Sequence, residues 1–235
     1  MIDVRPAASR FHTEIGWLDS WHCFSFGRHY DPAEVGHGLL LVLNDDRVAP
    51  GAGFATHAHR DMEIVTWVLE GALEHQDSAG HHGIIRPGEA QRMSAGRGIR
   101  HSEMNASATE PLHFLQMWVV PDRAGVEPGY EQVDVGDRLA SGALVCVAAG
   151  DGSGAVHIHQ AGAAMWVARL DAGQAVTVPA APFAHLFMAT GAASLDGTAL
   201  TAGDAARLRD AGEVPVTAVE PCEIVIWTSD AEVRR

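Results

Sequence analysis

The sequence predicts an all-β protein made of two related β-domains. Glycine and proline interrupt the chain often, with 25 and 11 among 235 residues, and the apolar segments between them are short. Several of these segments are rich in valine, isoleucine and tryptophan, which favour strands. Few windows show the 3.6-residue period and the capping residues that are typical of helices. Short strands joined by tight turns fold into sandwiches or barrels.

Five apolar segments have the length of a strand. They are Gly38 to Leu43, Ile64 to Leu69, Leu112 to Val120, Met165 to Leu170 and Glu223 to Trp227. The segment from Gly203 to Asp210 leaves two structures open, a turn of helix or a strand, because small residues alternate after its Gly-Asp start.

A pattern shared by residues 68–93 and 188–208 indicates an internal repeat. In both copies an apolar strand ends in glycine, at Gly71 and Gly191, and a polar hairpin follows. An apolar step and then Gly-Glu or Gly-Asp complete each copy, with a shorter hairpin in the second. Two related β-domains would produce this pattern.

The repeat predicts a first domain at residues 1–132 and a second at residues 133–235. The segment from Pro121 to Gly142 contains proline, glycine and charge with few apolar residues, so we expect it to be the linker.

The charge balance excludes several classes of partner. Sixteen basic residues stand against thirty acidic ones, which gives a formal net charge of −14 at pH 7. A protein that neutralises phosphates needs a basic face, so we expect no direct nucleic-acid binding and no anionic membrane partner. No apolar run has membrane-spanning length, and the N-terminal residues lack the features of a signal peptide. Three scattered cysteines, Cys23, Cys146 and Cys222, suit buried thiols in a reducing cytoplasm.

One window, from Gly51 to Asn105, carries most of the chemical information. One residue separates His57 from His59, and one separates His101 from Glu103. Residues i and i+2 of a strand point to the same face, about 7 Å apart. On neighbouring strands, three ring nitrogens and a carboxylate would converge inside a barrel. This donor set suits a first-row divalent metal such as iron, manganese, nickel, copper or zinc.

The residues around these pairs resemble the two cupin motifs. The matching positions are Gly51, His57, His59, Glu63 and Gly71 for the first motif, and Gly88, Ser94-Ala95-Gly96, His101 and Asn105 for the second. The Ser-Ala-Gly turn stands in place of Pro-x-Gly, the gap to His101 is longer than in the general motif, and Glu103 follows closely. These departures are similar to the pirin branch of the cupins. So are the segments GWLDSWHCFSFGRHYDP (16–32), HAHRDMEIVTWVLEGALEHQDSAG (57–80), IIRPGEAQRMSAGRGIRHSE (84–103) and LHFLQMWVVP (112–121).

The resemblance is nearest to the bacterial pirin-like quercetin 2,3-dioxygenases. It implies a bicupin, with two tandem cupin barrels of the double-stranded β-helix or jelly-roll type. It also implies one divalent metal ion per chain, held by His57, His59, His101 and Glu103. Iron is the leading candidate, and zinc, nickel, manganese, copper or cadmium are further candidates in the protein as isolated. In pirins the position of Glu63 carries the general cupin glutamate but is not a ligand.

The function implied by the resemblance is cleavage of the heterocyclic ring of a flavonol such as quercetin by dioxygen, with loss of carbon monoxide. The metal would bind the ionised 3-hydroxyl of the substrate, and Glu103 would either release its bond to the metal or accept the hydroxyl proton. A barrel interior favours a raised carboxyl pKa, which suits a proton acceptor.

Other residues have weaker assignments. Glu63 is interpreted either as a carboxylate that orients a ligand imidazole or as an inward charge with another partner. Phe24, Phe54 and Trp118 are candidates for an aromatic substrate pocket, as is Trp21, although aromatic residues of small barrels more often belong to the core. The remaining histidines, His75, His81, His82, His113, His157 and His159, are expected to be structural or exposed.

The second half of the chain lacks ligands at the corresponding positions. His57 and His59 precede Gly71 by 14 and 12 residues, and the same distances before Gly191 give Thr177 and Pro179. His101 and Glu103 follow Gly88 by 13 and 15 residues, and the same distances after Gly203 give Val216 and Ala218. None of these side chains is a usual metal ligand, so we expect a degenerate second barrel without metal.

Two alternatives to the dioxygenase remain at this point. The first is a non-enzymatic iron-binding regulator or redox sensor of the pirin type, which acts through protein partners. The second is a sugar-phosphate isomerase, for which Arg60, Arg97 and Arg100 would have to surround the metal and bind phosphate.

Overall fold

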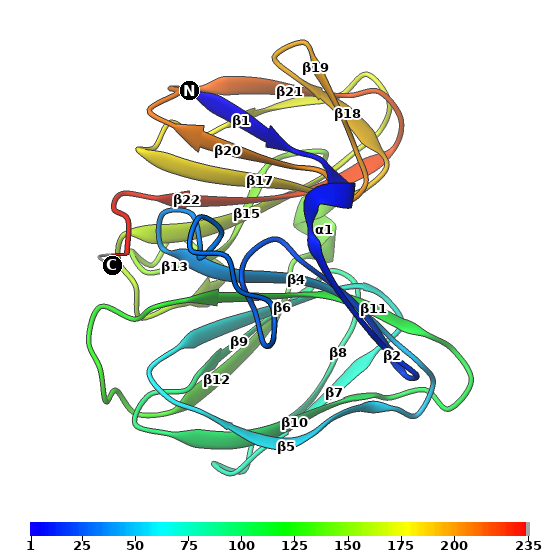
Figure 1. Cartoon of the computed structure of the whole chain (residues 1–235), viewed down its shortest axis with the longest axis vertical. Helices are drawn as coiled ribbons and strands as arrows, with labels where there is room; N and C mark the ends of the chain where they lie inside the picture. Colours follow the sequence, from blue (N-terminus) through cyan, green and yellow to red (C-terminus); the bar gives the residue numbers. More distant parts are fainter. Residues whose placement is uncertain (234–235) are drawn as a thin grey trace.

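The structure, a computed structural model, describes residues 1–233 and confirms the predicted all-β fold of two barrels (Figure 1). Each barrel pairs a seven-stranded sheet with a four-stranded sheet. No helix among the described residues is long and apolar enough to cross a membrane. The three cysteines are buried and free, as expected.

The first barrel contains eleven strands. In sheet order, its large sheet contains β12 (Gly129–Asp134), β9 (Glu89–Ser94), β6 (Glu63–Glu70), β11 (Leu112–Val119), β4 (Leu40–Val48), β3 (Leu18–His22) and β2 (Phe11–Ile15). Its small sheet contains β5 (Gly53–His59), β10 (Ile99–Asn105), β7 (Leu73–Asp77) and β8 (His82–Ile85).

The second barrel repeats this arrangement. Its large sheet contains β1 (Ile2–Arg5), β20 (Ala205–Arg209), β17 (Phe183–Thr190), β22 (Cys222–Ser229), β15 (Ala163–Leu170), β13 (Val145–Ala149) and β14 (Val156–His157). Its small sheet contains β16 (Ala175–Val178), β21 (Val214–Ala218), β18 (Ala192–Leu195) and β19 (Thr198–Thr201). A 3-10 turn, Ala7–Ser9, and one helical turn, α1 (Gly136–Leu139), complete the elements.

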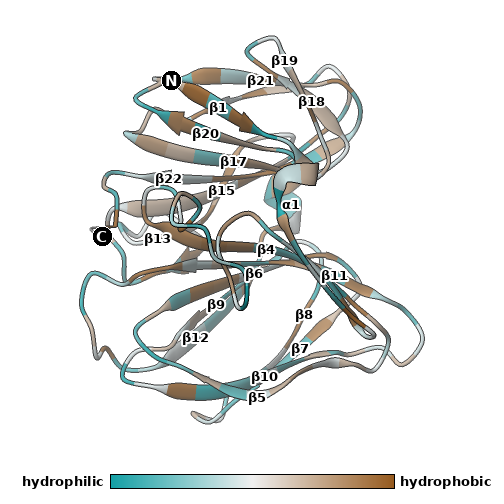
Figure 2. Ribbon diagram, in the orientation of Figure 1, coloured by the Kyte–Doolittle hydropathy of each residue, from teal (hydrophilic) through white to brown (hydrophobic). Residues whose placement is uncertain are grey.

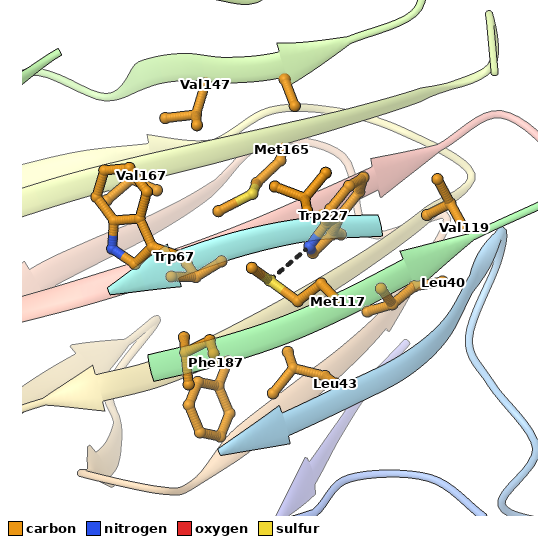
Figure 3. Close-up of a cluster of buried hydrophobic side chains, with 14 of the residues drawn as sticks. Leu40, Leu43, Trp67, Met117, Val119, Val147, Met165, Val167, Phe187 and Trp227 are labelled. Atoms are coloured by element: carbon orange, nitrogen blue, oxygen red, sulfur yellow. Dashed lines mark hydrogen bonds between the residues drawn. The ribbon is translucent and has the colours of Figure 1, made fainter. Parts of the chain in front are cut away.

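The two large sheets pack face to face and form the main hydrophobic core (Figure 3). Val65 and Trp67 of β6 and Leu115 and Met117 of β11 form part of the first sheet's side of this core. Across the interface lie buried side chains of the second sheet, namely Val147, Met165, Val167, Phe187, Val225 and Trp227. The indole N–H of Trp227 donates to the Met117 sulfur at 3.1 Å.

The opposite face of the first large sheet points into its own barrel. Along β11, Leu112 and Phe114 join a core within that barrel, and Gln116 and Trp118 border a cavity. This division follows from the two-residue period of a strand. Figure 2 shows that the small sheet also carries hydrophilic residues over much of β10.

The interior of the second barrel is apolar. Its core includes Leu186, Met188, Val216, Ile224 and Ile226, all with essentially no exposed surface. Side-chain packing thus fills the space that corresponds to the cavity of the first barrel.

One segment differs from the sequence-based expectations, and the structure decides between the two alternatives left open for another. The expected linker from Pro121 to Gly142 contains strand β12, which pairs with β9 along its whole length, and α1. The segment from Gly203 to Asp210 resolves into a strand, β20. The division at residues 132 and 133 stays a prediction, but β12 crosses it, and β1 lies in the second barrel because it pairs with β20.

Replacing Met117 by alanine should destabilise the protein by about 2–5 kcal/mol, the usual cost of truncating a buried methionine. The cavity would lie between the barrels, and the Trp227 N–H would lose its acceptor. Urea unfolding followed by tryptophan fluorescence measures the loss. Val133→Ala on β12 is the control, because Val133 is 38% exposed. Equal unfolding midpoints for the two variants would contradict a core role for Met117.

Candidate metal centre and adjoining cavity

Strands β5 and β10 bring three histidines together. The two strands are antiparallel neighbours, and His57 lies directly opposite His101. His59 follows on the same face, and its ring centroid lies 4.8 Å from that of His57 and 5.0 Å from that of His101. One potential ligand atom from each of the three lies within 4.8 Å of the others. Three of the four predicted ligands, His57, His59 and His101, therefore lie close together.

The histidine side chains have unprotonated nitrogens available for a metal. The Nδ1 of His57 lies 2.9 Å from the carbonyl oxygen of Ala55, which fixes the proton on Nδ1 and leaves Nε2 free. The Nε2 of His101 is buried and has no hydrogen-bond partner among the described residues. Burial, together with the neighbouring histidines, lowers the pKa of His101 to about 2 and that of His59 to about 4. Neutral imidazoles are the form that binds metals, so this donor set fits a divalent ion.

Glu103 lies beside the histidines and is held by a hydrogen-bond network. The side-chain N–H groups of Gln116 donate to its two oxygens at 2.7 and 2.9 Å, and Thr66 Oγ1 donates to Gln116 Oε1 at 2.8 Å. Burial raises the pKa of Glu103 to about 7, although the hydrogen bonds act against this rise. A carboxylate oxygen of Glu103 lies within 4.8 Å of ligand atoms of His75 and His101. The trio of His57, His59 and His101 forms a different group, which shares only His101 with the first. The ligand role of Glu103 stays a prediction.

A cavity of about 750 Å³ adjoins this cluster. Its aromatic and apolar lining is formed by Trp17, Leu18, Phe26, Phe54 and Trp118. Its polar lining includes Thr13, Ser20, His22, Asn44, Asp46 and Gln116, and His57, His59 and Glu103 border it as well. The ring of Trp118 stands edge-on to His59 with centroids 4.9 Å apart, so the cavity reaches the candidate metal position.

The candidate pocket residues divide into two groups. Phe54 and Trp118 line the cavity as expected. Phe24 is placed elsewhere: it is buried between the barrels, against the ring of His185 at 5.2 Å and beneath the Arg207 guanidinium at 4.8 Å. Trp21 stacks on His12, with centroids 4.0 Å apart, and is not among the lining residues.

Glu63 faces the second barrel. Ser94 Oγ donates to its carboxylate at 2.8 Å, and the backbone N–H of His159 donates at 3.1 Å. The alternation of β6 explains this direction, because Glu63 shares a face with Val65 and Trp67 of the inter-barrel core. Of the two interpretations of Glu63, the structure favours the inward charge with another partner.

A row of polar residues crosses the first large sheet and was missed by sequence reasoning. His22, Asn44, Gln116, Thr66 and Gln91 lie opposite one another on consecutive strands. The Nδ1 of His22 lies 2.8 Å from Asn44 Oδ1, which links β3 to β4. In the sequence, the one sign of this row is a polar residue at an inward-facing position of an otherwise apolar strand, such as Gln116 in β11. Only the strand pairing shows that these residues meet.

Asp46 lies next to this row, on the cavity wall. It is 3% exposed and accepts a short hydrogen bond from Ser20. Burial raises the pKa of Asp46 to about 7, and the nearby charges of Asp45 and Glu103 add to the rise. Near pH 7 the carboxyl group of Asp46 can therefore be either neutral or ionised.

Replacing Asp46 by asparagine should change the pH dependence of stability in the metal-free protein. Because folding raises the pKa from 3.8 to about 7, the native state binds a proton that the unfolded state has already released between these values. Asp46 should therefore contribute a loss of stability as the pH rises from about 4 to 7, and the neutral amide should remove that contribution. Urea unfolding at about pH 5 and pH 8 measures the effect, with the exposed Asp137→Asn as control. If the free energies of unfolding of parent and variant differed by the same amount at both pH values, the raised pKa of Asp46 would be contradicted.

Two family models match the chain. The model described as Pirin matches residues 4–119, and the model described as Quercetinase C-terminal cupin domain matches residues 146–227. A Mycobacterium tuberculosis protein named "Putative quercetin 2,3-dioxygenase Rv0181c" is 53% identical over 234 residues, which cover 98% of this chain and 96% of that protein. An Escherichia coli protein named Quercetin 2,3-dioxygenase is 55% identical over 132 residues, which cover 56% of this chain and 57% of that protein.

Solved structures show the same fold over the whole chain. YhhW from Escherichia coli superposes with a TM-score of 0.92 at 36% identity, covering 100% of both chains. The bacterial pirin YhhW from Escherichia coli in complex with nickel(II) superposes with a TM-score of 0.90 at 37% identity, covering 99% of this chain and 100% of that chain. This chain therefore belongs to the pirin family, and its two barrels have the cupin architecture.

Proposed function

We propose that this chain is a metal-dependent dioxygenase that opens the heterocyclic ring of flavonols such as quercetin, with iron as the native metal. The observation that carries the proposal is the position of the histidine trio on the wall of the 750 Å³ cavity. Cavities of about 300–1,000 Å³ accommodate organic ligands of this size. The relatives named quercetin 2,3-dioxygenase and the nickel complex of a bacterial pirin support it.

In this proposal His57, His59 and His101 hold the ion, with Glu103 as the fourth ligand. When bound, the ion supplies a Lewis-acidic position for the substrate hydroxyl and a partner for dioxygen. Phe54 and Trp118 flank a planar substrate and exclude water, because their rings line the cavity next to the histidines. The polar wall of Asn44, Asp46 and His22 can hydrogen-bond to phenolic hydroxyl groups.

Glu103 accepts the proton of the substrate hydroxyl in this proposal. Burial raises the pKa of Glu103 to about 7 in the metal-free chain, and contact with the ion would favour the ionised carboxylate, which is the form that accepts a proton. Gln116 holds both carboxylate oxygens and thereby fixes the direction of the acceptor.

The two alternatives have less support. A regulatory pirin would be favoured by a closed pocket with a conspicuous apolar patch. The described residues include few large exposed apolar side chains, namely Met1, Ile2, Ile15, Tyr30, Val133 and Val219. A phosphate site would need arginines in the cavity. Arg60, Arg97 and Arg100 instead border a second cleft, which shares only His59 with the cavity, and Arg97 pairs there with Glu127. Arg28 is the one arginine among the described residues that line the cavity.

The chain should bind one nickel ion tightly, because the second small sheet carries Thr177, Val216 and Ala218 on the strands that correspond to β5 and β10. Equilibrium dialysis with metal analysis measures the stoichiometry. His101→Ala should lose most of the affinity but keep the fold. His157→Ala, which removes an exposed histidine, should leave affinity unchanged. Two tightly bound ions per parent chain would show that the second barrel also binds metal.

Anaerobic reconstitution with iron(II), followed by dioxygen and quercetin, tests the activity. Carbon monoxide in the headspace and loss of flavonol absorbance are the expected results. Glu103→Gln should lower turnover by about 10²-fold or more, the usual scale for losing a general base, at equal metal content. Unchanged turnover in Glu103→Gln would remove its role as base. The absence of carbon monoxide from iron-loaded parent protein would refute flavonol cleavage.

A further inference from the structure

A buried chain of polar side chains lies behind His101, on the side away from β5. Strand β7 pairs with β10 there, and His75 lies opposite Glu103 while Asp77 lies opposite His101. The side chains of His75 and Asp77 are 1% and 0% exposed. Neither residue lines the 750 Å³ cavity, so a contact with the substrate does not account for them.

The contacts connect His101 to the surface through three residues. The Nδ1 of His101 lies 3.5 Å from the Nδ1 of His75, and the Nε2 of His75 lies 3.3 Å from Asp77 Oδ2. The same carboxylate oxygen lies 2.9 Å from the Nδ1 of His81, whose side chain is 38% exposed. The backbone N–H groups of Ala79 and His81 donate to the other oxygen, Oδ1, at 2.9 and 3.0 Å.

The protons along this chain have one consistent arrangement. A metal-binding nitrogen carries no proton, so His101 must carry its proton on Nδ1 when Nε2 faces the ion. Nδ1 of His101 then donates to Nδ1 of His75, which must be unprotonated. The proton of His75 therefore lies on Nε2 and is donated to Asp77. Although burial alone would raise the pKa of Asp77, hydrogen bonds from His81 and His75 lower it overall, so this acceptor is ionised.

Packing holds the rings of this chain in place. The ring of Tyr130 on β12 covers His75 and His81, with centroid distances of 4.9 and 5.6 Å. The Tyr130 hydroxyl donates to Gln132 at 2.7 Å, and Gln132 donates to the carbonyl of Ile84 at 3.0 Å. Gly83 leaves the room that Tyr130 needs, because a Cβ there would lie 2.1 Å from the tyrosine oxygen.

Among its described residues, the second barrel lacks both the ligands and a row of polar side chains like that of His75, Asp77 and His81. On β18, which pairs with β21 as β7 pairs with β10, Ala193 lies opposite Ala218 and Leu195 lies opposite Val216. Both β18 residues are buried and apolar. The fold therefore does not require polar residues at these positions. In this protein the polar residues occur in the same barrel as the histidine trio.

We propose that His75 is a positioning residue, which with Asp77 and His81 holds His101 in the tautomer and orientation that a metal ion requires. The proposal rests on the metal centre of the proposed function but is independent of flavonol cleavage. Partners that orient a ligand imidazole in this way typically contribute about 10–100-fold to metal affinity.

Nickel(II) affinity of two His75 variants, measured by equilibrium dialysis, tests the proposal. His75→Leu fills the site without hydrogen bonds and should bind nickel about 10–100-fold more weakly than the parent. His75→Gln should recover part of the loss, because its oxygen can accept from His101 and its N–H can donate to Asp77. His82→Gln is the matched control, because His82 lies on the same hairpin and its exposed side chain hydrogen-bonds to Glu74 and not to His75, Asp77 or His101. Its affinity should equal that of the parent.

The tautomer itself can be read in the zinc-loaded protein by nitrogen-15 NMR of the histidine rings. The parent should show His101 with a protected proton on Nδ1, and His75→Leu should lose that protection. Circular dichroism verifies that each variant is folded, and Asp77→Asn replaces His75→Leu if the latter does not fold, with a smaller expected loss of affinity. Equal affinity of parent and His75→Leu, or an unprotected Nδ1 in the parent, would overturn the proposal. Failure of the parent to bind nickel would refute the metal centre as well.

Discussion

The first large sheet is buried on both faces, and each face meets a different environment. On β11, Leu115 and Met117 contact the second barrel, while Gln116 and Trp118 border the cavity. Because side chains alternate along a strand, a shift of one residue would place Gln116 in the apolar core and Met117 beside Glu103. The packing between the barrels therefore fixes the strand register that positions the polar side chains of the site.

This register allows polar groups to be buried without being left unpaired. An unsatisfied polar group costs about 1–3 kcal/mol, so a cavity wall with Glu103, Gln116 and Thr66 is stable only as a connected network. Each of these residues comes from a different strand, and the strands are neighbours or cross the barrel. The candidate centre is thus built on sheets rather than on loops, which restricts the motion of its side chains.

Short-range periodicity accounts for what could be predicted from the sequence. The i, i+2 spacing of His57 and His59 and of His101 and Glu103 defines which side chains share a face, and the cupin-like frame indicates that their strands are neighbours. Residues whose roles depend on distant strand pairing were not predictable in this way. Glu63 follows the alternation of β6 toward the second barrel, Phe24 turns into the inter-barrel core, and β1 joins the second barrel instead of the first.

The second barrel can be essential to the site although it carries no ligand cluster among the described residues. Without it, Val65, Trp67, Leu115 and Met117 would be exposed together on one face of the first sheet. Polar contacts also cross the interface: the indole N–H of Trp67 donates to Glu223, and Arg92 donates to the carbonyl of His157 at 2.6 Å. Strand β1 adds a covalent constraint, because it pairs with β20 of the second barrel and is followed after one short turn by β2 of the first. A barrel without a ligand cluster among its described residues therefore still fixes the sheet on which the neighbouring centre is built.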